Sequence, residues 1–120
     1  MGTKIALIVD DDSATREVVG LHFSMMGFEV RSAGNGKAGL EALKKEPITI
    51  LFLDLAMPVL DGFETLKGIL ECNAGAVVVA VTAFAMRGDK ERALAAGFRD
   101  YITKPVEMNH LRIRVRELLA

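Results

Sequence analysis

An unbroken apolar run that ends in an aspartate, Thr49 to Asp54, constrains this chain more than any other stretch. Strands without polar alternation are typical of a parallel sheet that is covered on both faces. A carboxylate at the end of such a strand is costly unless solvent or a cation can reach it. The carboxyl end of a parallel strand is such a position, and open α/β sheets bind their ligands there. The run therefore predicts a buried central strand, and Asp54 becomes the candidate reactive group.

The composition indicates one soluble domain over residues 1–120. Of the 120 residues, 51% are hydrophobic and 26% are charged, and the formal net charge is −1. This is enough for a core without metal or disulfide support, and the charge points neither to nucleic acid nor to an anionic membrane surface. The single cysteine, Cys72, excludes an internal disulfide. Because there is neither a signal peptide nor an apolar run near the ~20 residues of a membrane helix, we expect a cytoplasmic location and no membrane contact.

Strand patterns and helix patterns alternate five times along the chain. The predicted strands are Lys4–Val9, Phe28–Ala33, Thr49–Asp54, Ala76–Val81 and Asp100–Thr103. The predicted helices are Ala14–Met26, Lys37–Lys45, a segment around Phe63–Leu70, Phe84–Ala96 and Glu107–Leu119. Alternation with short connections favours an α/β fold in which a doubly wound parallel sheet has helices on both faces.

Local signals add detail to two of these helices. Ser13 is a good N-cap for the first helix. The helix itself is indicated by apolar residues that recur on one face at helical spacing: Ala14, Val18, Leu21 and Met25, with His22 among them. Asp61-Gly62 indicates a turn and a helix cap. Gly68, inside the helix that follows, should cost about 1 kcal/mol relative to alanine, and the sequence alone offers no account of it.

Polar groups follow or end four of the predicted strands: Asp10 and Asp11, Asp54, Thr82, and Lys104. In a doubly wound sheet these ends are neighbours in space. Three carboxylates brought together stay ionised only if a cation joins them, and hard oxygen ligands favour Mg²⁺ or Mn²⁺. With an ammonium and a hydroxyl nearby, this set suits phosphoryl transfer, which depends on positioning and charge neutralisation.

Five blocks of sequence resemble the response-regulator receiver domain of two-component signalling, in the CheY-like superfamily. The blocks are Ile8-Val9-Asp10-Asp11, Leu53-Asp54-Leu55-Ala56-Met57-Pro58, Asp61-Gly62, Val81-Thr82-Ala83 and Lys104-Pro105. They occur in the family's order and cover essentially the whole chain. The resemblance implies a flavodoxin-like fold with strand order 2-1-3-4-5. It also implies a phosphoacceptor switch that is not a turnover enzyme.

The resemblance assigns roles around Asp54. Asp54 would accept a phosphoryl group from a sensor histidine kinase or a histidine phosphotransfer protein. Mg²⁺ would be held by Asp11, by Asp54 and by the backbone carbonyl of Ala56, while Asp10 would act through metal-bound water. Lys104 would contact a phosphoryl oxygen.

The resemblance also implies how the signal leaves the site. Thr82 would turn inward to the phosphoryl group, and Tyr101 would move between outward and inward positions with it. The bond before Pro105 is often cis in this family. The last helices would contact an output partner or effector domain, and a homodimer is an alternative use of that surface.

Other functions are favoured less by the same residues. A haloacid-dehalogenase-type phosphatase needs an acid two residues after its nucleophile, where this chain has Ala56. A flavodoxin-type electron carrier needs a phosphate-cradling loop rich in Ser, Thr and Gly, where this chain has three aspartates. A receiver-like scaffold or dimerisation module that works without phosphorylation stays open. Ala56 and Phe84 occupy positions that resemble those tuning the lifetime of the phosphorylated state in receiver domains, and both are non-ionic, which leaves that lifetime open.

Overall fold

The computed structural model describes residues 3–56, 61–73, 75–83 and 86–120. Its strands are β1 (Ile5–Val9), β2 (Glu29–Ala33), β3 (Ile50–Asp54), β4 (Val78–Thr82) and β5 (Asp100–Thr103). Its helices are α1 (Ser13–Met25), α2 (Gly36–Lys45), α3 (Gly62–Cys72), α4 (Asp89–Ala96) and α5 (Met108–Leu118). None of the helices among these residues is long and apolar enough to cross a membrane.

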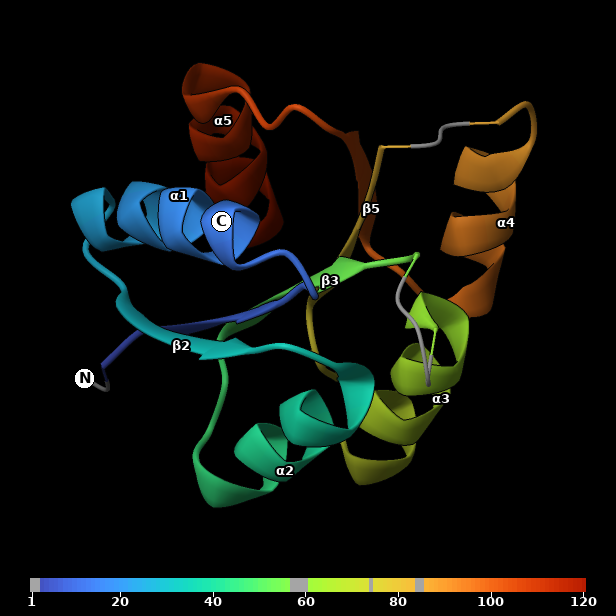
Figure 1. Cartoon of the computed structure of the whole chain (residues 1–120), viewed down its shortest axis with the longest axis horizontal. Helices are drawn as coiled ribbons and strands as arrows, with labels where there is room; N and C mark the ends of the chain where they lie inside the picture. Colours follow the sequence, from blue (N-terminus) through green and yellow to red (C-terminus); the bar gives the residue numbers. More distant parts are fainter. Residues whose placement is uncertain (1–2, 57–60, 74, 84–85) are drawn as a thin grey trace.

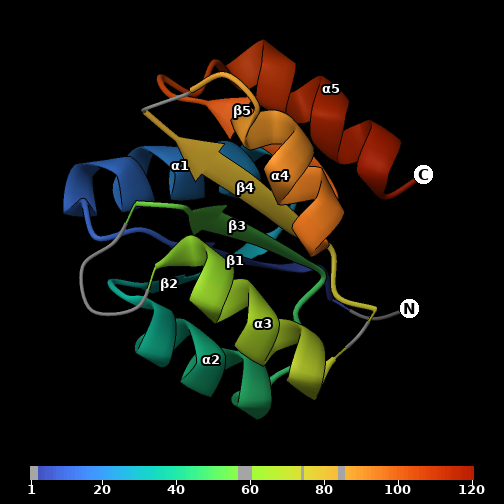
Figure 2. The same cartoon turned by 90° about the vertical axis from the view of Figure 1, so that its right-hand side faces the viewer.

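The five strands form one parallel sheet in the order β2-β1-β3-β4-β5 (Figure 1). Helices α1 and α5 cover one face, and α2, α3 and α4 cover the other (Figure 2). This confirms the predicted doubly wound fold and its strand order. Because β1 and β3 are neighbours at the centre of the sheet, the residues at their carboxyl ends come together.

Alternate residues of each strand supply two separate cores. In β3, Leu51 and Leu53 face the α2–α3–α4 side, while Ile50 and Phe52 face α1 and α5. All four are at most 2% exposed, as the unbroken apolar run predicts for a strand covered on both faces. The two cores hold the sheet rigid and leave only the strand ends free for chemistry.

The apolar stripe that indicates helix α1 is not the face that packs on the sheet. Val19 and Phe23 are buried, whereas Val18, Leu21 and Met25 are 52%, 59% and 63% exposed. The helix is rotated so that the large ring of Phe23 enters the core, where it packs edge-to-face on Phe28 and Phe52.

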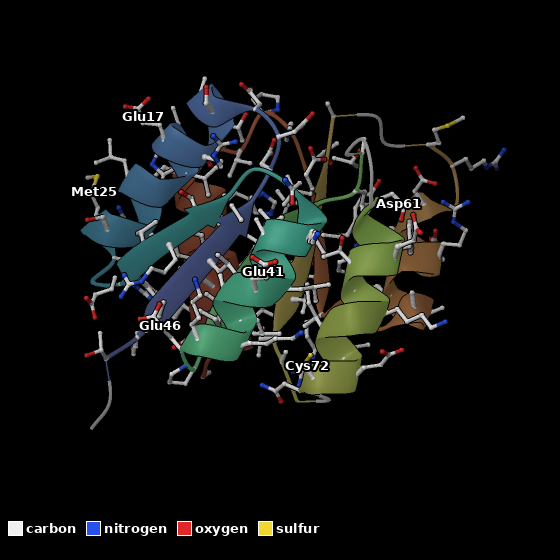
Figure 3. The ribbon with its side chains drawn as sticks, turned by 60° about the horizontal axis from the view of Figure 1, so that its bottom comes forward. Glu17, Met25, Glu41, Glu46, Asp61 and Cys72 are labelled. Atoms are coloured by element: carbon white, nitrogen blue, oxygen red, sulfur yellow. The ribbon has the colours of Figure 1, made fainter. Side chains whose placement is uncertain are left out.

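A small residue on the sheet side of α1 supports the same orientation. A Cβ placed on Gly20 would lie 3.2 Å from Cγ1 of Val30, so the helix approaches β2 closely at this point. Figure 3 shows Met25 and Glu17 on the outer side of α1. The helix therefore keeps a solvent-exposed apolar stripe.

The N-cap of α1 is Asp12, not Ser13. The Asp12 carboxylate accepts hydrogen bonds from the N–H of Ala14 (3.2 Å) and from the hydroxyl of Thr15 (2.7 Å). The Thr15 hydroxyl is the main reason that the pKa of Asp12 is lowered. Aspartate and serine are comparable caps, so the residue that adopts the extended cap conformation decides between them.

Helix α4 is shorter than predicted. It begins at Asp89, after Gly88, whose φ of 86° is left-handed and interrupts a helix. The Asp89 carboxylate accepts the N–H of Met86 (3.0 Å) and so closes the turn before the helix. The first predicted residues of this helix, 84–85, lie outside the described part of the chain.

Two glycines of α3 allow close approaches. A Cβ on Gly68 would lie 3.0 Å from Cδ1 of Leu40, so this glycine lets α2 and α3 pack tightly. A Cβ on Gly62 would lie 2.6 Å from Cα of Leu55 and 2.8 Å from the carbonyl oxygen of Asp54. Gly62 therefore gives α3 its place against the end of β3.

The predicted cap before α3 is confirmed. The Asp61 carboxylate accepts the N–H of Glu64 (2.9 Å), and the Glu64 carboxylate accepts the N–H of Asp61 in return. Figure 3 shows Asp61 and Cys72 at opposite ends of this helix.

A buried ion pair joins β5 to α5. The Asp100 carboxylate is buried and is held by the guanidinium of Arg114, with Nε of Arg114 2.6 Å from Oδ2. Burial alone would raise the pKa of Asp100, but the hydrogen bonds from Arg114 and from the Tyr101 N–H outweigh it and lower that pKa.

Candidate functional site

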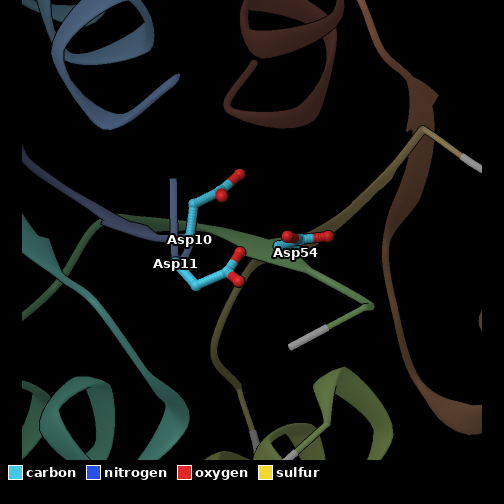
Figure 4. A group of neighbouring side chains, drawn as sticks. All are labelled: Asp10, Asp11 and Asp54. Carbon is cyan, nitrogen blue, oxygen red and sulfur yellow. The ribbon is translucent and has the colours of Figure 1, made fainter. Parts of the chain in front are cut away.

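Three carboxylates meet where β1 and β3 end. Asp10 and Asp11 follow the last residue of β1, and Asp54 is the last residue of β3. One oxygen of each lies within 4.8 Å of the others. Figure 4 shows the three side chains gathered together. Asp10 and Asp54 are buried, and Asp11 is exposed to solvent. The structure thus brings together the three acids that the sequence singles out.

Asp10 makes hydrogen bonds through both side-chain oxygens. Its Oδ2 lies 2.8 Å from Nζ of Lys104, and its Oδ1 accepts the N–H of Asp12 (2.9 Å). Its own N–H donates to the carbonyl of Ala33 (3.1 Å). Because both carboxylate oxygens already have hydrogen-bond partners, Asp10 is better suited to supporting a bound cation indirectly than to coordinating it directly.

Lys104 reaches the cluster from the end of β5. Its N–H donates to the carbonyl of Thr82 (2.8 Å), and its Nζ lies 3.5 Å from Oδ2 of Asp54. Burial on its own would lower the pKa of the Lys104 ammonium, but the Asp10 hydrogen bond and the charges of Asp54 and Asp10 raise it. Lys104 is therefore a permanent positive charge at neutral pH. The bond to Pro105 is cis, as expected.

Asp54 carries more negative charge around it than its partners offset. Burial raises the pKa of its carboxyl, and the charges of Asp10 and Asp11 add to the rise. The N–H of Ala56, 3.1 Å from Oδ1, and the ammonium of Lys104 act against it. The pKa nevertheless stays above the ordinary aspartate value. A hard cation that prefers oxygen ligands would offset the negative charge of these carboxylates.

Thr82 and Tyr101 lie on β4 and β5, the two strands that follow β3 across the sheet. Thr82 is buried at the end of β4, the strand next to β3. Tyr101 is half-buried in β5, and its hydroxyl oxygen is enclosed without a hydrogen-bond partner among the described residues. Burial is the main reason that the pKa of Tyr101 is raised, and the nearby charge of Asp89 at the start of α4 adds to it. The two candidate switch residues thus link the strand ends to α4.

The sequence analysis missed one residue near the acids. Arg16, one turn into α1, donates from Nη1 to the backbone carbonyl of Asp10 (2.7 Å). One arginine among the charged residues of α1 looks like a surface residue in a sequence, and only its short separation along the chain from the acidic turn could have drawn attention to it.

Comparisons with known proteins agree with this geometry. The family described as the response regulator receiver domain matches residues 6–116. An uncharacterised 14.6 kDa protein of Leptolyngbya boryana is 40% identical over 103 residues, covering 84% of this chain and 79% of that protein. The heme response regulator HssR of Staphylococcus aureus is 34% identical over 113 residues, covering 94% of this chain. The chain spans 50% of the length of HssR.

A solved relative is similar over nearly the whole fold. It comes from the CheX-CheY-BeF3-Mg²⁺ complex of Borrelia burgdorferi, with a TM-score of 0.93 and 28% identity, covering 98% of this chain and 90% of that one. Receiver domains of this family are signalling switches that work in two-component systems and bind Mg²⁺ at an acidic pocket. On its sequence, its fold and the acids at its strand ends, this chain belongs to the response regulator receiver domain family.

Proposed function

We propose that this chain is a phosphoacceptor switch in which Asp54 takes a phosphoryl group from the phosphohistidine of a sensor kinase or phosphotransfer protein. The observation that carries the proposal is the position of Asp54. It lies at the end of the central strand, with two further acids within 4.8 Å and the Lys104 ammonium 3.5 Å away. A carboxylate in this setting combines a nucleophile with charges arranged for a phosphoryl group.

Asp11, Asp54 and the backbone carbonyl of Ala56 would hold a Mg²⁺ ion, and Asp10 would act through a bound water. The setting of Asp54 supports this, because its burial and the charges of Asp10 and Asp11 raise the pKa of its carboxyl, and a divalent cation beside the three acids would offset their charge. The CheY of the Borrelia complex was solved with Mg²⁺ and BeF3. When bound, the ion neutralises charge on the transferring group and makes the approach of phosphate to three acids favourable.

The transfer itself forms one bond and breaks one. A carboxylate oxygen of Asp54 bonds to phosphorus as the N–P bond of the phosphohistidine breaks, and the imidazole nitrogen keeps the electron pair. Lys104 is placed to move its Nζ from the carboxylates to a phosphoryl oxygen, since it already bridges Asp10 and Asp54. The Thr82 hydroxyl, at the end of the neighbouring strand, would bond another phosphoryl oxygen.

Output would follow from Thr82 and Tyr101. If Thr82 turns toward the phosphoryl group, space opens near β5. The enclosed hydroxyl of Tyr101, which has no hydrogen-bond partner among the described residues, could then move into that space and lower the cost of its burial. That motion would alter the surface made by α4, β5 and α5, where an output partner or effector domain would bind. Phosphorylation then acts by shifting the population between two conformations.

The phosphodonor has a surface on which to dock beside the site. Ala14, Thr15, Val18 and Val19 of α1 line an apolar groove of about 460 Å³ together with Lys104 and Pro105. Two further apolar residues of α1, Leu21 and Met25, are also exposed. An apolar surface next to the reacting group suits a helical partner that must bring a phosphohistidine to Asp54.

Intact-mass spectrometry with acetyl phosphate tests the proposal. We expect one added phosphoryl group on the wild type with Mg²⁺, and none with EDTA or on Asp54→Asn. Asp61→Asn, an acid outside the cluster, serves as the control and should still be labelled. If no adduct forms, a beryllofluoride titration distinguishes rapid loss of the phosphoryl group from a scaffold that works without phosphorylation.

A further inference from the structure

Asp10 needs a hydrogen-bond donor for its backbone carbonyl as well as for its carboxylate. The residue lies just beyond the end of β1, so the strand ladder no longer supplies that donor. The helix ladder of α1 begins later, where the N–H of Arg16 donates to the carbonyl of Asp12 (3.1 Å). A buried carbonyl between the end of a strand and the start of a helix is costly without a partner.

Arg16 supplies this donor from its side chain. Its Nη1 lies 2.7 Å from the Asp10 carbonyl oxygen, a short charge-assisted hydrogen bond. The side chain is half-buried and folds back toward the start of its own helix. Its charge thus acts on the backbone of the acidic turn, while Lys104 acts on the Asp10 carboxylate.

The loop after β2 makes room for the guanidinium. A Cβ placed on Gly34 would lie 3.4 Å from Nη1 of Arg16, an ordinary contact distance, so the guanidinium packs against the backbone of this loop. The preceding residue, Ala33, accepts the N–H of Asp10 (3.1 Å). The backbone N–H of Asp10 is therefore fixed by Ala33, and its backbone carbonyl is fixed by Arg16.

The planarity of the peptide bond connects this contact to Asp11. The carbonyl oxygen of Asp10 and the nitrogen of Asp11 belong to one rigid plane. A donor that fixes the oxygen also fixes the direction in which the Asp11 chain leaves the strand. Asp11 is exposed and has no side-chain hydrogen bond among those found in the described residues, so its backbone is what directs it toward Asp54.

We propose that Arg16 is a positioning residue for the cation site: through the Asp10 carbonyl it holds the Asp11 carboxylate where a divalent ion can join it to Asp54. This inference rests on the proposed function, because it assumes that the acids bind Mg²⁺. It assigns Arg16 no contact with the ion or with the phosphoryl group.

The test is Mg²⁺ affinity, measured by isothermal titration on Arg16→Met, Arg16→Lys and the control Arg112→Met, an exposed arginine of α5. We expect Arg16→Met to weaken Mg²⁺ binding about tenfold, as supporting residues around metal ligands commonly do. Arg16→Lys should recover part of the loss, and Arg112→Met should match the wild type. At saturating Mg²⁺, the labelling rate of Arg16→Met should return to near that of the wild type.

A hydrogen-exchange measurement and a second variant also test the role of Arg16. In the metal-free protein, Arg16→Met should speed hydrogen exchange at the Asp12 amide, which is bonded to Asp10. If Arg16→Met does not fold, Gly34→Val, whose γ methyl groups would crowd the guanidinium without removing it, should weaken Mg²⁺ binding in the same direction. Folded variants with Mg²⁺ affinity within twofold of the wild type would overturn the role of Arg16. A wild type that binds no Mg²⁺ would overturn the proposed function, and this inference with it.

Discussion

The Nζ atom of Lys104 lies 2.8 Å from Oδ2 of Asp10, so the strand-end lysine is held most closely by an acid other than the candidate phosphoacceptor. Its distance to Asp54 is 3.5 Å. Lys104 therefore offsets the charge of the whole cluster and repels any cation that enters it.

We expect Lys104→Met to tighten Mg²⁺ binding, by roughly tenfold, because a positive charge next to three carboxylates is removed. The same change should abolish the response of Tyr101 to phosphorylation, since the phosphoryl group loses its ammonium partner. Isothermal titration gives the affinity, and the Tyr101 ring signals in NMR report the response. Lys67→Met, on the exposed side of α3, is the matched control. An affinity equal to or weaker than that of the wild type would contradict this account of Lys104.

The raised pKa of Asp54 predicts a pH-dependent cost in stability. Because the folded protein holds the Asp54 proton more tightly than the unfolded chain, ionised Asp54 destabilises the metal-free protein at neutral pH. The cost is absent below the ordinary aspartate pKa of about 3.9 and grows as the pH rises through the folded value. Asp54→Asn should therefore unfold a few degrees above the metal-free wild type at pH 7.

The comparison with Asp54→Asn isolates this group, because the other acids titrate in both proteins. Thermal unfolding by circular dichroism in EDTA, from pH 7 to pH 3.5, should show the difference in Tm shrinking as the pH falls. Saturating Mg²⁺ at pH 7 should also close the gap. A difference in Tm that stays constant across the pH range would show that the ionisation of Asp54 is not its cause.

The sequence predicted the sheet and the residues at its strand ends because both depend on short-range pattern. Runs such as Ile50–Asp54 can be buried on two faces in few ways, and parallel strands bring their carboxyl ends to one edge. The face of α1 that packs on the sheet could not be predicted in this way. Val18 and Leu21 are as apolar as Val19 and Phe23, so periodicity alone could not decide which pair meets the core. The fit of the Phe23 ring and the closeness of Gly20 to β2 decide it, and both are tertiary.

Contacts between side chains and the backbone could not be predicted from the sequence either, because they also depend on tertiary structure. Asp12 and Ser13 are both good caps, and Arg16 is one of several charged residues on α1. The choice among them depends on the path of the chain between β1 and α1. The roles assigned to the site residues by resemblance, from Asp54 to Tyr101, stay predictions for the experiments above.

The Asp100–Arg114 pair predicts a second pH-dependent effect, of opposite sign. Arg114→Met leaves a buried carboxylate without its main partner, which costs several kcal/mol in a fully buried pair. The Arg114 side chain is 36% exposed, so we expect about 2 kcal/mol at pH 7. Because the pKa of Asp100 is lowered, its contribution is present above the ordinary aspartate pKa and is lost as the pH falls through the folded value.

Urea unfolding at pH 7 and pH 3 measures this loss. Arg116→Met, an exposed arginine of the same helix, should change the free energy of unfolding by less than about 0.5 kcal/mol at either pH. For Arg114→Met, the destabilisation should be smaller at pH 3 than at pH 7. An equal loss at both pH values would mean that Arg114 acts through packing and not through its charge.

Gly62 and Gly68 form a matched pair that separates a backbone contact from a side-chain contact. A methyl group on Gly62 would meet Cα of Leu55 at 2.6 Å and the carbonyl oxygen of Asp54 at 2.8 Å, and neither atom can move without shifting the end of β3. On Gly68 it would meet the flexible end of Leu40 at 3.0 Å, while alanine gains about 1 kcal/mol of helix propensity over glycine. We therefore expect Gly62→Ala to destabilise the protein by about 2–3 kcal/mol and to slow labelling of Asp54, and Gly68→Ala to be within about 1 kcal/mol of the wild type and to be labelled normally. Urea unfolding and acetyl phosphate labelling of both variants decide the matter: equal effects from the two substitutions would show that the contact between Gly62 and the Asp54 carbonyl does not hold the phosphoacceptor in place.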